Sequence, residues 1–277
     1  MTHTFEPEAN KPGTQAGPIP EAAQETLPVV YQDEHLVVIN KPTGLLVHRS
    51  PIDRHETRFA VQLLRDQLGQ HVYPVHRLDK PTSGLLVFAL NGDVARALSE
   101  KFNDKTIKKQ YLALCRGYMP SQRLDYALSV KLDRIADKHK QQDKAAQPAI
   151  TDFTTLATCE LPYAVDRYPV SRYSLVLCEP HTGRKHQIRR HLKHAGHPII
   201  GDAKHGKSVH NRFFANTFQA DHLLLSAVGL DFSHPVTGTR LTLNCAAAPK
   251  FIQAIKRIDW QEPDWAVAIA PKWLAHG

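Results

Sequence analysis

The sequence predicts an α+β fold, with a central, mostly antiparallel mixed sheet that is flanked by helices and loops. Three observations support this prediction. Segments with the apolar pattern of strands outnumber those with the pattern of helices. The two kinds do not alternate regularly along the chain, as they would in a doubly wound parallel fold. One continuous apolar run, residues 85–90, is typical of a strand that is buried on both faces.

The first predicted elements lie on either side of a turn that contains Pro42 and Gly44. Residues 36–40 and 45–48 are mostly apolar and end at this turn, so both are predicted strands. Residues 57–68 carry large apolar side chains at helical spacing, which predicts a helix. The glycine that follows, at position 69, is a suitable C-terminal cap.

The next elements follow a loop that is rich in Pro, Ser and Gly. Residues 85–90 form the buried strand, and Asp93 is placed to cap a helix after it. The apolar face of that helix is expected to hold Val94, Leu98 and Phe102. Residues 111–115 then return as a predicted strand.

The second half of the chain is again dominated by strands. They are predicted at residues 173–177, 223–230 and 241–244, and helices are predicted at residues 185–195 and 249–258. The first of these helices has one apolar face, formed by Ile188, Leu192 and Ala195. Its basic residues, which lie on other faces, are Lys185, Arg189 and Lys193.

Composition divides the chain into three parts. Residues 1–27 contain four prolines, few large apolar residues and one lysine against four glutamates, which predicts a disordered leader with a charge of −3. The rest of the chain therefore carries +11. Residues 28–258 are predicted to form a single domain with a packed core. Residues 259–277 form a tail with three tryptophans, to which the sequence assigns no role.

The 277 residues carry a formal net charge of +8. This favours a polyanionic partner such as nucleic acid, although a mildly basic balance also serves solubility alone. The four cysteines are scattered without a C-x-x-C pair, which suits a reducing compartment. There is no signal-peptide pattern and no apolar run of the roughly 18 residues that a membrane helix needs. These features predict a cytoplasmic protein without a membrane segment.

Residues 76–84 (HRLDKPTSG) are the first segment that could carry chemistry. Asp79 stands between Arg77 and Lys80, and these cations favour its ionised form. An ionised carboxylate on a loop can act as a nucleophile or base without a cofactor. The segment alone also allows a simple turn in which the aspartate caps its own backbone.

Residues 184–212 hold eight Lys or Arg residues and a single acid, Asp202. Such a basic segment is suited to contact phosphates, although a solvated basic face is the simpler interpretation. Seven histidines lie within residues 181–210, but they lack the H-E-x-x-H spacing and have no Cys or acid pair beside them. No metal site is therefore predicted, and the histidines are expected to donate hydrogen bonds to phosphate or 2′-hydroxyl groups.

Tyr111 lies at the start of a predicted strand, after two lysines. Its ring could stack on a nucleic-acid base, or it could simply pack against the sheet. The sequence contains no P-loop, no Rossmann glycine pattern and no G-x-S-x-G elbow. These absences argue against ATP-dependent, NAD-dependent and α/β-hydrolase chemistry.

These segments, in this order, resemble the pseudouridine synthases of the RluA type. The matching motifs are residues 40–48 (NKPTGLLVH), 76–84, 109–113 (KQYLA), 182–191 (TGRKHQIRRH), 197–202 (HPIIGD) and 234–238 (HPVTG). The resemblance covers residues 28–258. It implies the pseudouridine synthase fold in a single catalytic domain, and an isomerase that converts uridine to pseudouridine in RNA.

The resemblance implies a role for four residues. Asp79 matches the catalytic aspartate of the family, and Arg77 matches the arginine that fills the gap left by the flipped nucleotide. Tyr111 matches the tyrosine that stacks on the target base, and Arg189 matches the basic residue that pairs with the aspartate. Because the reaction neither gains nor loses atoms, the resemblance implies no cofactor and no metal.

Further segments resemble the branch of the family that modifies uridine 65 in the T stem of tRNA. They are residues 48–50, 53–54, 69–72, 135–138, 143–144, 147–149, 167–169 and 204–206, together with Lys185 and Arg190. This branch implies tRNA as the partner, no protein partner and a monomeric enzyme.

Three alternatives stay open. The first is a synthase that acts on ribosomal RNA, or on both ribosomal RNA and tRNA. The second is an RNA-binding protein that has lost catalysis, against which the intact Asp79, Tyr111 and Arg189 argue. The third is a glycosidase with paired carboxylates, for which Asp79 lacks an acidic partner within its motif.

Overall fold

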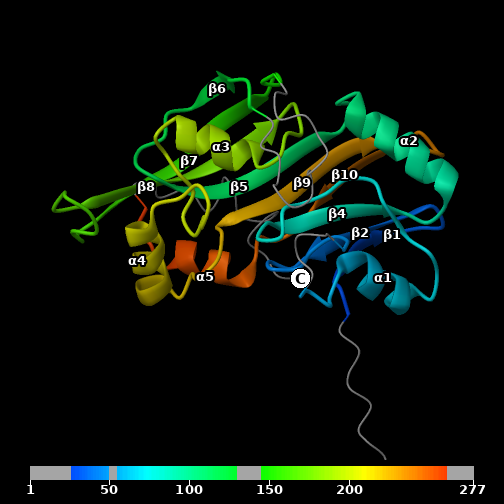
Figure 1. Ribbon diagram of the computed structural model, residues 1–277, viewed down its shortest axis with the longest axis horizontal. Helices are drawn as coiled ribbons and strands as arrows, with labels where there is room; N and C mark the ends of the chain where they lie inside the picture. The colour runs from blue at the N-terminus through cyan, green and yellow to red at the C-terminus, as the bar shows by residue number, and fades with distance from the viewer. Residues whose placement is uncertain (1–25, 50–54, 130–144, 261–277) are drawn as a thin grey trace, which may run out of the picture.

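The computed structural model describes residues 26–49, 55–129 and 145–260, which form a ten-stranded sheet with five helices (Figure 1). The strands are β1 (Val29–Gln32), β2 (Leu36–Lys41), β3 (Tyr73–Pro74), β4 (Ser83–Ala89), β5 (Lys108–Arg116), β6 (Gln122–Asp125), β7 (Ile150–Leu161), β8 (Ser171–Pro180), β9 (Leu225–Ser233) and β10 (Arg240–Asn244). The helices are α1 (Ala60–Leu68), α2 (Gly92–Asn103), α3 (Gln187–His194), α4 (Ser208–Phe218) and α5 (Pro249–Lys256).

The sheet is mixed and almost entirely antiparallel. Its order is β1-β2-β4-β9-β5-β8-β7-β6, with β10 paired to β9 and β3 paired to β4. The pairing of β4 with β9 is parallel, and the other named strand pairs are antiparallel. This architecture confirms the predicted α+β class with a mostly antiparallel mixed sheet.

The parallel contact between β4 and β9 joins two parts of the sheet. We call β1–β4 the N-terminal half-sheet and β5–β10 the C-terminal half-sheet. Only Ser83 and Gly84 pair with β9, opposite Ser226 and Ala227. Gly84 has φ +109°, and a Cβ on it would lie 2.1 Å from the carbonyl oxygen of Ala227. The close approach of the two strands therefore requires glycine at this position.

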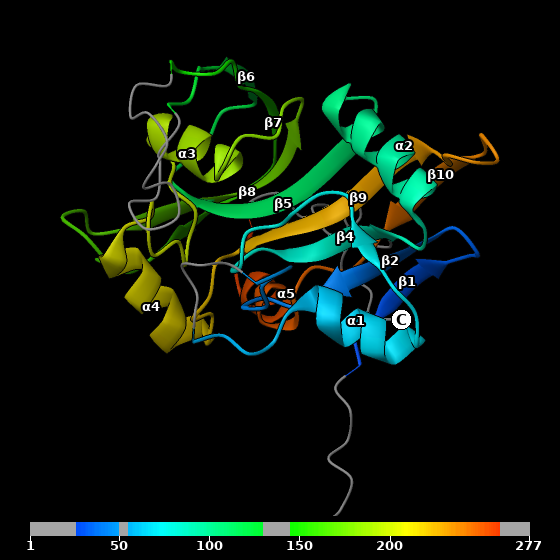
Figure 2. The same ribbon diagram turned by 45° about the vertical axis from the view of Figure 1, so that its right-hand side comes forward.

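Helices pack on both faces of the sheet, because neighbouring residues of a strand point to opposite faces. In β4, Phe88 packs with α1 whereas Val87 packs with α2. In β5, Leu112 packs with α4 and α5 whereas Ala113 packs with α3. Figure 2 shows α3 across the sheet from α4 and α5. Each fully buried large apolar side chain contributes about 1.5–3 kcal/mol, so these layers hold the central strands in place.

Two local predictions are wrong. Residues 45–48 do not form a strand: Leu46 makes one isolated bridge to Phe59. The backbone carbonyls of Leu46 and Val47 instead accept hydrogen bonds from the first N–H groups of α1, at 2.8 and 3.0 Å. Such groups need partners at the start of any helix, and this use of the segment displaces strand pairing.

The second wrong prediction concerns the cap of α2. Asn91 caps this helix, since its side chain accepts a hydrogen bond from the backbone N–H of Val94, and Asp93 lies in the first turn. Several elements were not predicted from the sequence, namely β1, β6, β7 and α4. In β7 the inward residues include Thr151, Ala157 and Cys159, which are small or polar and give little apolar signal.

Residues 26–27 and 259–260 are the only described parts of the predicted leader and tail. Leu27 and Trp260 are buried and pack in the core, and the indole N–H of Trp260 donates to the carbonyl of Ile255 at 2.9 Å. Residues 50, 53–54, 135–138 and 143–144, which contributed to the resemblance, lie outside the described residues. No helix in the described ranges is both long enough and apolar enough to cross a membrane.

Candidate active site

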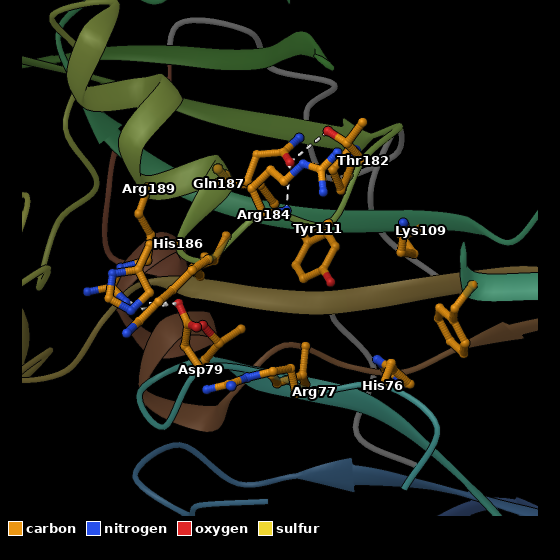
Figure 3. A pocket seen from close by; sticks show the side chains of 18 of the residues that line it. His76, Arg77, Asp79, Lys109, Tyr111, Thr182, Arg184, His186, Gln187 and Arg189 are labelled. Atoms are coloured by element: carbon orange, nitrogen blue, oxygen red, sulfur yellow. Dashed lines mark hydrogen bonds and ion pairs between the residues drawn. The ribbon is translucent and has the colours of Figure 1, made fainter. Parts of the chain in front are cut away.

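A pocket of about 440 Å³ opens where the two half-sheets meet (Figure 3). Its lining comes from the loop between β3 and β4, from residues 102–105, from β5, from residues 180–189 and from the start of β9. Asp79, Arg77, Tyr111 and Arg189 all line it, although they come from segments far apart in the sequence. The structure thus brings together the four residues that the sequence singled out.

The loop that carries Asp79 is clamped by the turn after β2. Lys41 is fully buried, and its ammonium donates to the backbone carbonyls of Pro42, Leu45 and Lys80 at 2.8, 2.9 and 3.3 Å. The backbone N–H of Gly44 also donates to the carbonyl of Lys80, at 2.9 Å. These bonds fix the backbone next to Asp79, as a site on a loop requires.

Arg189 links two carboxylates. Its Nη1 donates to Oδ2 of Asp79 at 2.9 Å, while its Nε and Nη2 donate to the two oxygens of Asp202 at 2.8 Å each. The side chain of Arg189 is only 4% exposed and that of Asp202 is not exposed, whereas that of Asp79 remains 19% exposed to the pocket. Arg189 therefore faces inward, so the alternative interpretation of residues 184–212 as a solvated basic face does not apply to it.

Asp202 orients the arginine from the side away from the pocket. Burial by itself would raise the pKa of Asp202, but the hydrogen bonds from Arg189 and from the backbone N–H groups of His205 and Lys204 outweigh it and lower that pKa. The pairing likewise raises the pKa of Arg189 against the effect of burial. Asp202 thus stays ionised, and Arg189 keeps one N–H pointed at Asp79.

The turn before α3 is held to β7 by side-chain hydrogen bonds. The Thr182 hydroxyl donates to Oε1 of Gln187 at 2.7 Å, and the Gln187 amide donates to Ile150 and Thr151 at 3.0 and 2.9 Å. This network explains why threonine and glutamine stand five residues apart here. It fixes the start of α3, from which Arg189 projects.

His186 lies at the N-cap of α3 in the left-handed conformation, with φ 56° and ψ 31°. Its Nε2 is 3.7 Å from Oδ2 of Asp79, and its Nδ1 is 2.9 Å from Nε2 of His205. Burial lowers the pKa of His186 to about 4, with Arg189 and His205 adding to the effect against Asp79. The imidazole is therefore neutral at neutral pH, and its contact with Asp79 is not an ion pair.

Tyr111 projects from β5 toward the same space as Asp79 (Figure 3). Burial first, and then the charge of Asp79, raise the pKa of its phenol well above the usual value. The ring therefore enters the pocket as a neutral phenol. An aromatic face beside a carboxylate is an arrangement that can hold a planar base against the reacting group.

Arg77 is exposed at the rim of this pocket and of a neighbouring pocket of about 330 Å³ that Asp79 also lines.

Two of the histidines in residues 181–210 are buried and do not donate to phosphate as expected. His191 contacts Thr151 and Tyr126. His210 is likewise buried, beside the hydroxyl of Tyr173. Within the described ranges, no three His, Cys, Asp or Glu residues gather as metal ligands.

Two residues of the site were not predicted from the sequence. Asp202 ends the motif at residues 197–202 but was assigned no role, although it is the single acid among eight cations in residues 184–212. That isolation was the available signal, because a lone acid in a basic segment is suited to pair with one of the cations. His186 was grouped with the other histidines, and nothing in the sequence set its left-handed backbone apart.

A family model described as RNA pseudouridylate synthase matches residues 35–194. The chain is 51% identical over 236 residues to tRNA pseudouridine synthase C of Pasteurella multocida (strain Pm70), covering 85% of this chain and 97% of that one. It is 54% identical over 218 residues to the protein of the same name from Yersinia pestis, covering 78% and 85%.

The fold is also shared with a solved structure. Human RNA Pseudouridylate Synthase Domain Containing 1 superposes with a TM-score of 0.62 and 25% sequence identity, covering 93% of this chain and all of that one. The predicted pseudouridine synthase fold is thus confirmed. On this sequence and structural similarity, the chain belongs to the RNA pseudouridylate synthase family.

Proposed function

We propose that this chain isomerises uridine to pseudouridine in tRNA, at uridine 65 in the T stem. The observation that carries the proposal is the carboxylate of Asp79, held by Arg189 at 2.9 Å in a pocket that Tyr111 also lines. The relatives' names support tRNA as the substrate. We assign the catalytic domain to residues 28–258, acting as a monomer in the cytoplasm.

The reaction moves one bond of the nucleoside. The bond between N1 of the base and C1′ of the ribose breaks, the base turns, and a bond between C5 and C1′ forms. C5 loses its proton and N1 gains one, so the atoms balance within the uridine. This stoichiometry supports a mechanism that uses protein side chains without a cofactor.

Asp79 acts on the nucleoside by one of two routes. Its carboxylate attacks the ribose or the base, or it abstracts a proton from the ribose. Either route needs an ionised carboxylate oxygen within reach of the nucleoside, and Arg189 holds Oδ2 while the other oxygen is left for the substrate. We assign Asp79 as the catalytic residue and Arg189 as the residue that binds and orients it.

The target base must leave its stack before it can reach Asp79, at a cost of roughly a few kcal/mol. Tyr111 offsets part of this cost because base–aromatic stacking contributes about 1–3 kcal/mol. Arg77, at the rim, is placed to enter the space that the extruded nucleotide leaves in the RNA. We assign both as substrate-binding residues.

Replacement of the catalytic carboxylate tests the mechanism. Asp79→Asn is expected to abolish pseudouridine formation while tRNA binding changes less than about threefold, because the amide keeps the shape but not the charge. The measurement is single-turnover product formation alongside equilibrium binding. Normal product formation by Asp79→Asn would refute the assigned role, and inactivity of the wild-type enzyme on tRNA would support a protein that only binds RNA.

A map of pseudouridine tests the substrate. In a strain without this protein, position 65 of tRNA should hold unmodified uridine, and ribosomal RNA should keep all its pseudouridines. Retention of pseudouridine at position 65 contradicts the assignment. Loss in ribosomal RNA as well would indicate the dual-substrate alternative.

A further inference from the structure

The far end of the main pocket holds residues for which the proposed reaction has no use. This end lies between the C-terminal end of α2 and the start of β5, away from Asp79. It is lined by His76, Phe102, Asn103, Lys105 and Lys109, and we call it the distal subsite. In Figure 3, His76 and Lys109 lie to one side of Tyr111, and Asp79 and Arg189 lie to the other.

Lys109 places a positive charge in this subsite that no acid in the described ranges balances. Lys109 and Tyr111 are two residues apart on β5 and both line the pocket, whereas Lys108 does not. No hydrogen bond or ion pair joins the side-chain ammonium of Lys109 to another described residue, although its backbone pairs with β9. Burial, and then the charge of Lys105, lower the pKa of Lys109. A partly desolvated ammonium of this kind is stabilised by an anion from outside.

His76 adds a neutral donor beside the lysines. The backbone N–H of Val87 donates to its Nε2 at 3.0 Å, so that nitrogen is an acceptor and the proton of the neutral ring resides on Nδ1. Burial, and then the charge of Lys109, lower the pKa of His76 to about 3, which keeps the ring neutral. The ring stacks on Phe102 with centroids 4.3 Å apart, and this contact fixes its plane.

The subsite therefore offers donors to an incoming group and few acceptors. Asp79 is the one acid among the residues that line the pocket, and Arg189 already pairs with it. Two lysines and an imidazole N–H match the several acceptor oxygens and the negative charge of a phosphate. A base edge is read by a mixture of donors and acceptors. Asn103 supplies one side-chain acceptor here, but the two lysines and the imidazole N–H outnumber it and favour an anion.

We propose that the distal subsite binds a backbone phosphodiester of the RNA, next in the chain to the nucleotide that enters the pocket. The inference rests on the proposed function and deepens it, since it states how the enzyme grips the strand from which the uridine is extruded. A fixed phosphate beside Tyr111 holds the strand in place while the base turns between Asp79 and the ring. Lys109 is the central contact, and Lys105 reinforces it from the exposed side.

The first test compares adjacent lysines of the same strand. Lys109→Gln should weaken equilibrium binding of tRNA about five- to tenfold near 0.1 M salt, and should reduce the slope of log Kd against log salt by about 0.9, the value for one phosphate contact. Lys108→Gln, whose side chain does not line the pocket, is the matched control and should change binding less than twofold. Lys109→Arg should restore the slope. An unchanged slope in Lys109→Gln overturns the proposal.

The second test identifies the ligand as a phosphate of the RNA. Substrates carry one neutral methylphosphonate at each position near the target uridine in turn, and binding is measured with Asp79→Asn so that no turnover occurs. One position should weaken binding about five- to tenfold and should have no further effect in the Asp79→Asn, Lys109→Gln double variant. Fully additive effects at every position overturn the proposal. A wild-type enzyme that forms pseudouridine alongside such additive effects leaves the proposed function standing and removes only the subsite.

Discussion

The bridge formed by Arg189 makes Asp202 a positioning residue for catalysis, and Asp202→Asn tests this. Oδ1 of Asp202 accepts hydrogen bonds from the backbone N–H groups of Lys204 and His205, each at 2.9 Å, and from Nη2 of Arg189. An asparagine can keep these three bonds with its carbonyl oxygen. Its NH2 group then replaces Oδ2 and faces the Nε–H of the arginine, so a donor meets a donor.

The cost follows from burial. A hydrogen bond between charged groups contributes about 1.5–3 kcal/mol, and breaking a buried ion pair costs about 3–5 kcal/mol. Because the asparagine keeps the hydrogen bonds to Oδ1, including the one from Nη2 of Arg189, we expect the lower end of this range, a loss of about 3 kcal/mol in the free energy of unfolding. The guanidinium also loses its fixed orientation toward Asp79, and misplacement of a catalytic group by about 1 Å can cost 10²-fold in rate. We therefore expect kcat to fall about 10²-fold.

The assay is release of tritium from uridine labelled at C5 of tRNA, with stability measured by urea unfolding. Activity is measured where circular dichroism shows the variant folded, so that unfolding does not lower the rate. Asp231→Asn is the control. Arg240 donates two hydrogen bonds to Asp231 in the same geometry, at 2.9 and 2.7 Å, but the side chain of Arg240 is 67% exposed. Such an exposed pair contributes at most about 1 kcal/mol. Wild-type kcat in folded Asp202→Asn would refute the positioning role.

Two further predictions follow from the structure. Because the pKa of Asp202 is lowered in the folded protein, its contribution to stability is complete above the ordinary value of 3.8 and disappears as the pH falls through the lower folded value. The difference in unfolding free energy between the wild type and Asp202→Asn should therefore shrink below about pH 4 in urea titrations, and a constant difference down to pH 2 contradicts the reasoning. Gly84→Ala places its Cβ 2.1 Å from a backbone oxygen of Ala227 and should cost more than about 4 kcal/mol, whereas Gly92→Ala, with no atom within 4 Å of its Cβ, should change stability by less than about 1 kcal/mol in the same urea assay.

The sequence predicted the fold class because strong local patterns mark the central strands. The apolar run at residues 85–90 and the cap at Gly69 are local features, and both have counterparts in β4 and α1. The sequence failed where the partners of a segment are distant. Residues 45–48 have a strand-like composition, but their carbonyls are used by α1 and by the Lys41 ammonium. Composition does not reveal such a competition for hydrogen bonds.

For the site, the sequence identified the residues that line the pocket but not all of the contacts between them. The motifs and the family resemblance identified Asp79, Arg77, Tyr111 and Arg189, and the structure brings these residues to one pocket. Neither identified the second partner of Arg189, Asp202, because the two residues are not placed together by any local pattern. The burial of Arg189 depends on Asp202, which lies beyond the end of the helix and meets it only after the chain turns at residues 195–201.

The narrow parallel contact between β4 and β9 bears on how the chain becomes active during folding. Asp79 belongs to the N-terminal half-sheet, and Arg189 lies 110 positions later, on a helix packed against the C-terminal half-sheet. Contacts between such distant segments carry a large loop-closure entropy and form late. A nascent chain that has formed only one half-sheet can present a basic surface to RNA, but its acid and its arginine remain apart. Catalytic competence therefore requires that the two half-sheets have docked, and its appearance during folding reports that docking.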